Sequence, residues 1–497
     1  MRSVMRVGLV TCAMMVAASC TAGDRPGAGT DRPGVVRQSH RSAQTTTDTF
    51  NPPPAESRAI TLVGEQNFGG RGAFGDLWVH GDHAYVGSYR SGGCRGYGVS
   101  VANVSNPRRP TPVSTFAAYP HTSAEDIEVL SVRNRFFNGS LAVVGLQDCS
   151  ETTDVAGQRG LDLWDTTNPR SPRRLSFIPT SAAHDGGVHE LDVFQRDGRV
   201  YVIIANNFFG VEDPLRLGET RIFDITDPRH PAFVSDWSIG RDGRLAFGSE
   251  LFSDTPPGNC AASPGRPSEC RAATSGGYPV VSAHGASVSA DGTRAFLSYW
   301  DAGAIVLDIR DPRRPRMIGR ANSPPTDEGD MHSAVSVPYF CNQLMITTDE
   351  DWSPVFNLEG ETDDVWGYAR LWDIANPSRP RQIGRIESPH SASARADGYY
   401  SVHNPVTIQN LAFFSWYTDG LRVYDLANPR APELLGYFDA PRVPDPEPGE
   451  FPNPTGAVWG LSVKPPYVYL SDMNAGLYIV RLAPSIMARF RGPYNAD

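Results

Sequence analysis

One short motif recurs six times along this chain and limits what the chain can fold into. In each copy an apolar strand, ending in an acidic residue or its near equivalent, runs into an Asn-Pro or Asp-Pro pair, and another proline soon follows. The copies begin at Asn106, Asn168, Asp227, Asp311, Asn376 and Asn428. Successive copies lie 52 to 84 residues apart, so the unit is constant while its loops vary in length. Because proline fixes φ and Asn or Asp side chains bond to the nearby backbone, each motif predicts a tight turn between two strands.

Two further apolar strands precede each copy. Before the turn at Asn428 they span residues 405–408 and 411–416, and a seventh strand at 477–482 lacks the turn. The 48 Gly and 42 Pro residues also favour many short strands over long helices. Four short strands per unit in seven units are typical of a β-propeller. We therefore predict an all-β fold, a seven-bladed β-propeller with four-stranded blades over residues 58–484, followed by a C-terminal tail at 485–497.

The last unit has no fourth strand on its C-terminal side. Residues 60–65 resemble the fourth strands of other units, such as 433–437. We expect this N-terminal strand to complete the last blade and so leave no sheet edge free. The sequence leaves open the alternative that residues 58–70 belong to an N-terminal tether.

The N-terminus has the organisation of an export signal over residues 1–19. Two arginines precede an apolar stretch, and residues 17–20 (AASC) resemble a bacterial lipobox, although Ala17 stands where that motif usually has Leu. The resemblance implies cleavage before Cys20 and lipidation of its thiol. An ordinary secretory peptide cut after Ser19 or Ala22 is the alternative. Residues 20–57 are poor in large apolar side chains and predict a disordered tether, so we expect an exported protein anchored by lipid at the cell surface or periplasmic face.

The pattern of the third strand resembles a known family. A glycine followed by apolar-x-Val/Ile-x-Asp, as in residues 420–425, is similar to the repeat of the LVIVD-repeat family of bacterial surface proteins. The resemblance covers about residues 75–482. It implies a β-propeller and says almost nothing about function.

Export also bears on the cysteines, because disulfides form outside the cytosol. Cys260 and Cys270 lie close together in one loop that is rich in Pro and Gly. Cys94 and Cys149 lie at equivalent places in consecutive repeats. We predict the bonds Cys94–Cys149 and Cys260–Cys270, which leave Cys341 as the odd thiol.

The long connections should lie on one face of the ring, called the top face here. In a propeller the connections between blades share this face with the loops between the second and third strands. The long ones are 147–159, 206–219, 240–283, 349–368 and 439–458. Long loops carry function more often than turns do, so the top face is the predicted working face. Arginines gather in the opposite turns, which indicates either a solvated surface or a basic underside resting on anionic lipid.

Histidines recur at the residue that enters each innermost strand. The aligned residues are Gly75, Glu125, His189, His284, His332, His403 and Trp459. Since all innermost strands surround the channel, the four imidazoles could converge on one Zn, Cu or Fe ion. Glu125 would then be a further ligand or an acceptor that orients a ring nitrogen, and Asp126, Glu190, Asp192 and His184 lie close in sequence. The alternative is packing inherited by duplication.

A weaker candidate for a metal site lies in the fifth unit. Residues 349–351 (DED) could bind calcium, but their spacing is not that of an EF-hand. The net charge of −10 speaks against a nucleic-acid partner. No Gly-x-Ser-x-Gly, His-Glu-x-x-His or glycine-rich phosphate motif is present.

These observations support two hypotheses about function. The first is a monomeric, membrane-anchored binding module that takes a protein, glycan or small molecule on its top face, at a His-lined channel mouth. The alternative is a metal-dependent oxidoreductase or hydrolase centred on the four histidines. Carotenoid oxygenases and selenium-binding proteins are propellers with a His-bound metal, but that analogy concerns the fold alone.

Overall fold

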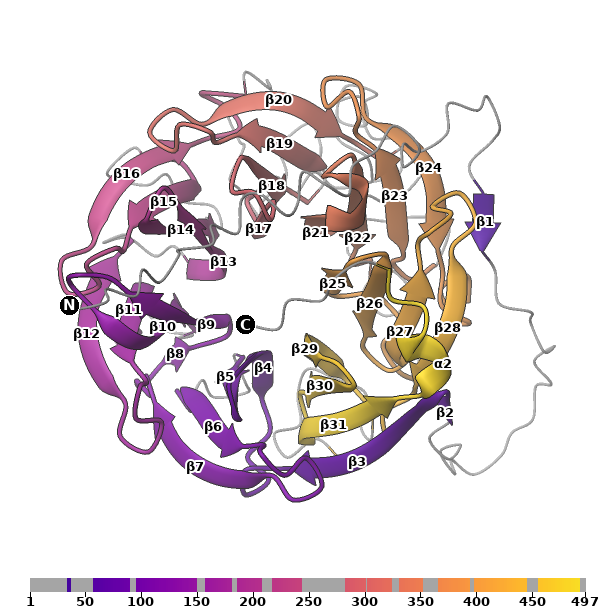
Figure 1. Cartoon of the computed structure of the whole chain (residues 1–497), viewed down its shortest axis with the longest axis horizontal. Coiled ribbons are helices and arrows are strands. Elements are labelled where there is room, and N and C mark those ends of the chain that lie inside the picture. The colour runs from indigo at the N-terminus through magenta and orange to yellow at the C-terminus, as the bar shows by residue number, and fades with distance from the viewer. Residues whose placement is uncertain are drawn as a thin grey trace, which may run out of the picture.

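The structure of the protein is a computed structural model. It describes residues 34–36, 57–89, 95–149, 157–180, 186–207, 217–243, 282–300, 302–323, 330–351, 365–393, 397–444 and 455–491. Antiparallel sheets form a ring around a central space, with one strand of each sheet innermost (Figure 1). The fold is thus all-β and β-propeller-like. None of the described helices is long and apolar enough to cross a membrane.

The sheets form from strands that are consecutive in the chain, each pairing with the one before. In the first half, from the inner to the outer strand, they are β4 (Phe74–His80), β5 (His83–Ser88), β6 (Val99–Asn103) and β7 (Thr111–Phe116); β9 (Ile127–Arg133), β10 (Asn138–Asp148), β11 (Gly160–Asp165) and β12 (Arg173–Pro179); and β13 (Gly187–Arg196), β14 (Arg199–Asn207), β15 (Thr220–Asp224) and β16 (Ala232–Trp237). The last two groups are joined by a single pairing of Gln147 with Gly187, and the short β8 (Thr122–Ser123) also pairs with β10.

The second half repeats this order. Its sheets are β17 (Gly285–Val288), β18 (Arg294–Ser298), β19 (Ala304–Asp308) and β20 (Arg316–Ala321); β21 (Met331–Ser336), β22 (Leu344–Asp349), β23 (Ala369–Asp373) and β24 (Arg381–Ile386); β25 (Pro405–Ile408), β26 (Leu411–Trp416), β27 (Gly420–Asp425) and β28 (Glu433–Phe438); and β29 (Val458–Lys464), β30 (Tyr467–Asp472) and β31 (Gly476–Leu482) with β3 (Ile60–Gln66). The strand β3 pairs antiparallel with β31, from Ile60 opposite Leu482 to Gln66 opposite Leu477. The N-terminal strand therefore is the fourth strand of the last sheet.

The Asn-Pro and Asp-Pro turns close on themselves as their sequence predicts. At Asn168 the side-chain Oδ1 accepts a hydrogen bond from the backbone N–H of Arg170 (3.2 Å), and the backbone oxygen accepts one from Ser171 (3.0 Å). The same two bonds recur at the turns that begin at Asn106, Asp227, Asp311, Asn376 and Asn428. Each turn forms the hydrogen bonds of its own backbone within a few residues. This explains why the turn can recur while the loops on the other face vary.

The acidic residue that ends a third strand pairs with an arginine. Asp165 lies 2.7 Å from Arg173, and Asp308 lies 3.3 Å from Arg316. Equivalent pairs elsewhere are Asp224–Arg199, Asp373–Arg381 and Asp425–Arg489. The arginines are largely exposed, so each pair stabilises the fold by only about 0–1 kcal/mol. Among the arginines that the sequence gathers near these turns, Arg173, Arg316 and Arg381 thus have their charge balanced by the acid of their own sheet.

A small residue in several outer strands receives the prolyl turn of the next sheet. Ser235 Oγ donates a hydrogen bond to the backbone oxygen of Pro312 (2.6 Å). At Gly319 a Cβ would lie only 1.7 Å from the backbone oxygen of Pro377. The turn can therefore approach this strand so closely only where the strand has a glycine. The same contact links β3 to the first sheet, because a Cβ on Gly64 would lie 2.0 Å from the backbone oxygen of Pro107.

Short segments at both ends of the chain add to the outer strands. The strand β1 (Gly34–Val36) pairs parallel with β24, and β2 (Ser57–Arg58) pairs with β28. The tether predicted over 20–57 includes β1, and most of that segment lies outside the described residues. The helix α2 (Pro484–Met487) packs Ile486 into the core between the β25–β28 sheet and the last sheet, next to the predicted boundary at 484.

A buried carboxylic acid makes the stability of the fold depend on pH. Glu219 is 1% exposed, and burial raises its pKa from 4.5 to about 7. The folded state therefore holds a proton that the unfolded state has lost, and stability falls as pH rises from about 4.5 to about 7. We expect the Glu219→Gln variant to reduce the difference in unfolding free energy between pH 5 and pH 8 by about 2–3 kcal/mol. Urea denaturation at both pH values measures this, with the exposed Glu65→Gln variant as the control; equal pH dependence in both variants would contradict the expectation.

Candidate functional site

The four predicted histidines lie where four consecutive inner strands begin. Two of them lie within these strands, His189 in β13 and His332 in β21. The other two lie just before them: His284 precedes β17 by one residue, and His403 precedes β25 by two. All four are buried. Their imidazoles form one row, with ring centroids 4.2 Å apart from His189 to His284, 4.0 Å on to His332 and 4.2 Å on to His403. The alignment of the repeats thus located a real cluster.

Backbone acceptors fix the tautomer of two of these rings. His284 Nδ1 lies 3.1 Å from the backbone oxygen of His332, and His403 Nδ1 lies 2.9 Å from that of Trp459. A carbonyl oxygen only accepts, so each Nδ1 carries the proton and each Nε2 keeps its lone pair. His403 Nε2 is buried and has no hydrogen-bond partner among the described residues.

A chain of side chains fixes the third ring. Asn404 Nδ2 donates to Asp76 (3.3 Å) and Glu190 (3.4 Å), so its Oδ1 is free to accept from the hydroxyl of Ser333. The oxygen of Ser333 then accepts the Nδ1 proton of His332 across 2.9 Å. His332 therefore also presents an Nε2 lone pair, in the arrangement by which neighbouring residues orient metal-binding histidines.

His189 differs from the other three. Its Nε2 lies 2.6 Å from Nε2 of His284, so in the absence of a metal one nitrogen donates to the other. Its Nδ1 lies 3.0 Å from the side-chain nitrogen of Gln147 and 3.2 Å from Glu125 Oε2. Glu125 therefore contacts the nitrogen that points away from His284. This Glu125 oxygen is buried and has no hydrogen-bond partner among the described residues, so both roles predicted for Glu125 remain predictions.

The ligand atoms fall into two overlapping groups. Glu190, His284 and His332 form one, and His332, Glu350 and His403 form the other; within each group the candidate atoms lie within 4.8 Å of one another. His332 belongs to both groups and His189 to neither. The sequence had noted Glu190 only as a neighbour, and Glu350 only as part of a calcium candidate. Glu350 Oε2 lies 3.6 Å from His332 Nε2, and its Oε1 accepts a hydrogen bond from the hydroxyl of Tyr417.

The remaining acids of the calcium candidate do not join this site. Asp349 is paired instead with the buried Arg370 at 2.7 Å. The three carboxylates of residues 349–351 therefore do not all act together on one ion in the described geometry.

Burial keeps the histidines uncharged. It lowers the pKa of His284 and of His332 well below the usual value, and lowers that of His403 to about 3; neighbouring histidines lower the pKa further in each case. Neutral imidazole is the form that binds a metal ion. His284, His332 and His403 are thus in the form that binds metal across the physiological pH range.

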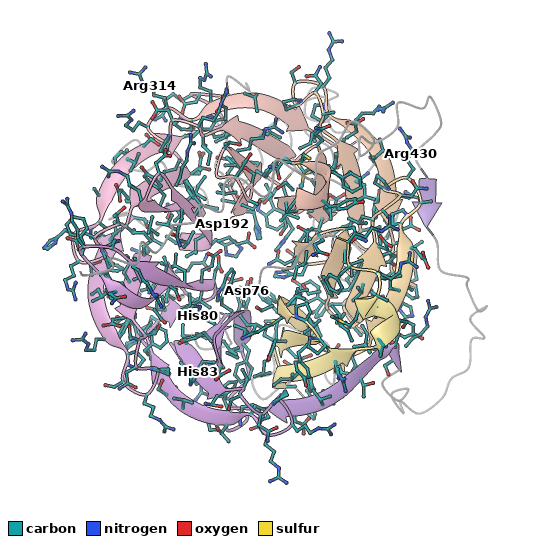
Figure 2. All side chains as sticks on the ribbon, viewed as in Figure 1. Asp76, His80, His83, Asp192, Arg314 and Arg430 are labelled. Carbon is teal, nitrogen blue, oxygen red and sulfur yellow. The ribbon has the colours of Figure 1, made fainter. Side chains whose placement is uncertain are left out.

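Carboxylates that are buried, like Asp126, or half-buried, like Asp192 and Asp76, line the inner strands beside the histidines. Asp126 accepts a hydrogen bond from the backbone N–H of Leu191 (2.6 Å), and Asp192 accepts one from Val288 (2.6 Å). These bonds tie adjacent inner strands together, which is a structural role. Burial raises the pKa of Asp192 and of Asp76 to about 7. Figure 2 shows both residues toward the centre of the ring, with Arg314 and Arg430 at its outer edge.

A pocket of about 200 Å³ opens beside the histidine row. Its lining includes His189, His284, His332, Glu350, Gln147 and Asp148 together with the aromatic residues Tyr89, Trp300 and Trp459. Trp300 packs against His284, with ring centroids 4.5 Å apart, and Trp459 packs against His403 at 4.3 Å. The pocket thus combines metal-binding nitrogens with aromatic walls, which is a combination suited to a small ligand.

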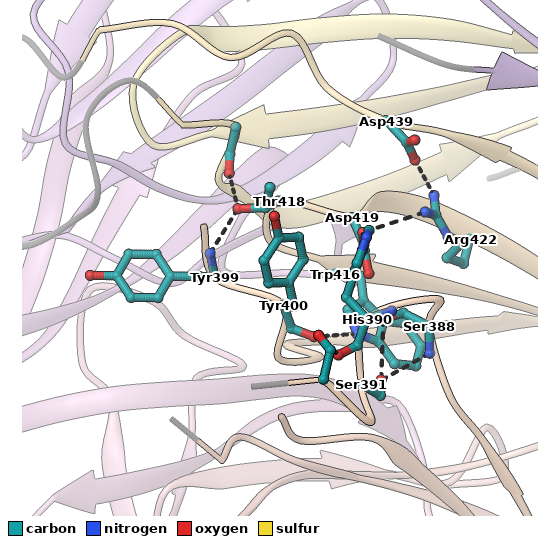
Figure 3. Close-up of polar contacts among 12 residues, drawn as sticks. Ser388, His390, Ser391, Tyr399, Tyr400, Trp416, Thr418, Asp419, Arg422 and Asp439 are labelled. Atoms are coloured by element: carbon teal, nitrogen blue, oxygen red, sulfur yellow. Dashed lines mark hydrogen bonds and ion pairs between the residues drawn. The ribbon is translucent and has the colours of Figure 1, made fainter. Parts of the chain in front are cut away.

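A hydrogen-bonded network holds the segment that carries His403. The N–H of Tyr399 donates to Thr418 Oγ1 and the indole of Trp416 donates to the backbone oxygen of Tyr400, both at 2.9 Å. Figure 3 shows these contacts and, beside them, His390 against Asp419 (2.7 Å). The positions of residues 399–403 are thereby fixed by the β26–β27 hairpin rather than by the loop before them.

Several predicted site residues lie outside the described part of the chain. They are Cys20, Cys94, His184, Cys260 and Cys270. The two predicted disulfide pairings therefore remain predictions. Cys149 and Cys341 are both in the disulfide-bonded state, so the expectation that Cys341 is an unpaired thiol is not met.

Comparison with known proteins identifies one element of the chain. The model of the LVIVD repeat matches residues 455–481. This chain carries an LVIVD repeat. The LVIVD segment spans β29, β30 and nearly all of β31, and it includes Trp459 of the pocket. Among solved structures, the computationally designed Ika8 protein is similar over 85% of this chain and 99% of its own, with 9% identity and a TM-score of 0.41. The search of curated proteins returns no match.

Proposed function

We propose that this protein is an exported, lipid-anchored, seven-bladed β-propeller that binds a transition metal at the top of its channel. The grouping of strands into seven sets of four supports the blade count. Closure of the ring is supported by the pairing of β3 with β31 and by the contact of Gly64 with Pro107. The anchor at Cys20 rests on the sequence motif.

The observation that carries the metal site is the set of oriented Nε2 lone pairs. His284, His332 and His403 each have Nδ1 committed to an oxygen acceptor, which leaves Nε2 available. A buried nitrogen without a partner, such as His403 Nε2, is costly unless it has a ligand. Nitrogen donors of this type bind Zn, Cu and Fe.

His189 and Glu125 would complete the site. When Nδ1 of His189 donates its proton to Glu125, the Nε2 atom beside His284 becomes a further donor. The pair then forms the carboxylate–histidine arrangement that is common around protein-bound zinc. Glu350 and Glu190 are the carboxylates within reach of the same nitrogens.

The function that this site supports best is binding of a small molecule at the metal. The pocket beside the histidines has room for such a molecule and opens on the face with the long loops. The protein is then a monomeric surface module whose top face is the working face, and its natural ligand could be free or be part of a glycan or a protein.

A second function, a metal-dependent oxidoreductase or hydrolase, is favoured by Glu350. This carboxylate lies beside His332 and accepts a hydrogen bond from Tyr417, so two groups that can exchange a proton border the proposed metal. A carboxylate in this place can take up a proton during hydrolysis, and a redox-active metal would support oxidation instead.

Metal analysis of the protein expressed without a His-tag tests the proposal. After incubation with Zn, Cu or Fe and removal of free metal, we expect about one ion per chain for at least one of the three. Protein that emerges free of all three metals would contradict the proposal. The metal that is retained also narrows the second function, because zinc excludes oxidation by the metal itself but still permits hydrolysis.

A further inference from the structure

Two tryptophans of the pocket have indole N–H groups without a partner. The Nε1 atoms of Trp300 and Trp459 are buried, and neither has a hydrogen-bond partner among the described residues. Trp459 is 6% exposed. Two other described tryptophans, Trp164 and Trp237, also have unpartnered indoles, but neither lines this pocket. Trp300 and Trp459 do line the pocket, so a ligand bound there is the candidate for the missing acceptor.

The charges of the pocket restrict what that ligand can be. The described residues that line it include the acids Glu350 and Asp148 but no Lys or Arg. An indole N–H only donates, so a ligand that pairs with it must carry a hydrogen-bond acceptor. Oxygen anions accept the strongest hydrogen bonds. Asp148 is paired with Arg159, so Glu350 is the acid of the lining that would repel such an anion in the absence of a positive charge. A bound metal ion supplies that charge at the histidines, so binding of the anion should require the metal.

The size and walls of the pocket restrict the ligand further. Its volume is about 200 Å³. An engineered apolar cavity of about 150 Å³ accommodates benzene, so one aromatic ring with a few additional atoms fits here. Tyr89 and Trp459 lie against each other with ring centroids 4.6 Å apart and form an aromatic wall.

We infer that the pocket binds a small molecule in which an oxygen anion is attached to a single planar ring, as in an aromatic carboxylate. The anion binds the metal and accepts a hydrogen bond from Trp459 Nε1, while the ring contacts the aromatic wall. This inference rests on the proposed metal site and adds the class of ligand to it.

The test uses cobalt(II), whose visible absorption reports its ligands, and benzoate as the probe. Cobalt-loaded full-length protein is titrated with benzoate, and metal-free protein is titrated in parallel by calorimetry. We expect benzoate to change the cobalt spectrum with saturation, and no heat of binding in the absence of metal. The Trp459→Phe variant keeps the ring but loses the donor, so it should bind cobalt normally and benzoate at least about ten-fold more weakly. Trp78→Phe, on the partly exposed side of β4, is the matched control and should bind both as the wild type does.

The outcomes separate the two proposals. If no cobalt binds, the metal site fails and the inference fails with it. If cobalt binds but benzoate leaves the spectrum unchanged at high concentration, the inference alone is overturned. Equal benzoate affinity in the Trp459→Phe and wild-type proteins would also overturn it. Should Trp459→Phe unfold, Trp300→Phe tests the second indole donor of the pocket, because Trp300 lines the same pocket and its N–H also has no partner among the described residues.

Discussion

Replacing His332 with alanine abolishes metal binding and leaves the protein folded. His332 is the one residue shared by both groups of candidate ligand atoms, so its loss leaves neither group complete. We expect the metal content to fall from about one ion per chain to less than a tenth, since loss of a histidine ligand removes a metal–nitrogen bond. Elemental analysis after dialysis measures this. His189 belongs to neither group, so His189→Ala should weaken metal binding less.

The matched control is His230→Ala, because the His230 side chain is 82% exposed in a turn far from the pocket. It should retain the wild-type metal content. Circular dichroism establishes that each variant is folded. If His332→Ala and His230→Ala retain the same amount of metal, the site described above is not where the metal binds.

Removing residues 1–66 prevents stable folding, whereas removing residues 1–56 does not. The longer deletion removes β3, which pairs with β31 through six of its seven residues. It also removes Ile60, which is 2% exposed in the core shared by the last two sheets. Loss of one such side chain lowers the unfolding free energy by about 2–4 kcal/mol. A domain is typically stable by about 5–15 kcal/mol, so loss of the whole strand should remove a large part of that stability.

Thermal melting followed by circular dichroism checks this prediction. The 57–497 protein should melt cooperatively at a temperature close to that of the full chain. The 67–497 protein should aggregate or melt without cooperativity, because the freed edge of β31 exposes unpaired backbone groups. A 67–497 protein that melts like the longer one would show that β3 contributes little, and would remove the main support for a closed ring.

The repeat made the strands predictable. The tight turn at Asn168 and its five relatives depend on bonds between residues two and three apart, so the local sequence determines them. The same regularity placed His189, His284, His332 and His403 in one register, and the structure brings these four rings into contact.

The rest of the site depends on contacts between distant segments, which a single sequence does not reveal. Asn404 is an unremarkable residue in the sequence, yet it determines which nitrogen of His332 carries the proton through Ser333, 71 positions away. Glu350 belongs to an acidic stretch that looked like a solvated loop or a calcium site. Its approach to His332 depends on how β22 ends next to the inner strand β21, and the alignment of repeats contains no such information.

Pairing of charges was missed for a related reason. The arginines near the prolyl turns were counted as free positive charge, but Asp165 and Arg173 show that the acid at the end of the third strand contacts an arginine eight residues later. That spacing was visible in the sequence at Asp308 and Arg316 and at Asp373 and Arg381, and could have been used.

The bonds around Asn404 also bear on how firmly the histidines are held. Asn404 contacts Asp76 and Glu190, and with Ser333 these residues come from four different sheets that meet near the axis of the ring. The Nδ1 proton of His332 is therefore positioned by side chains from several sheets at once. A displacement of any one of these sheets would reach the imidazole through this chain of bonds, so the geometry of the site depends on the integrity of the ring as a whole.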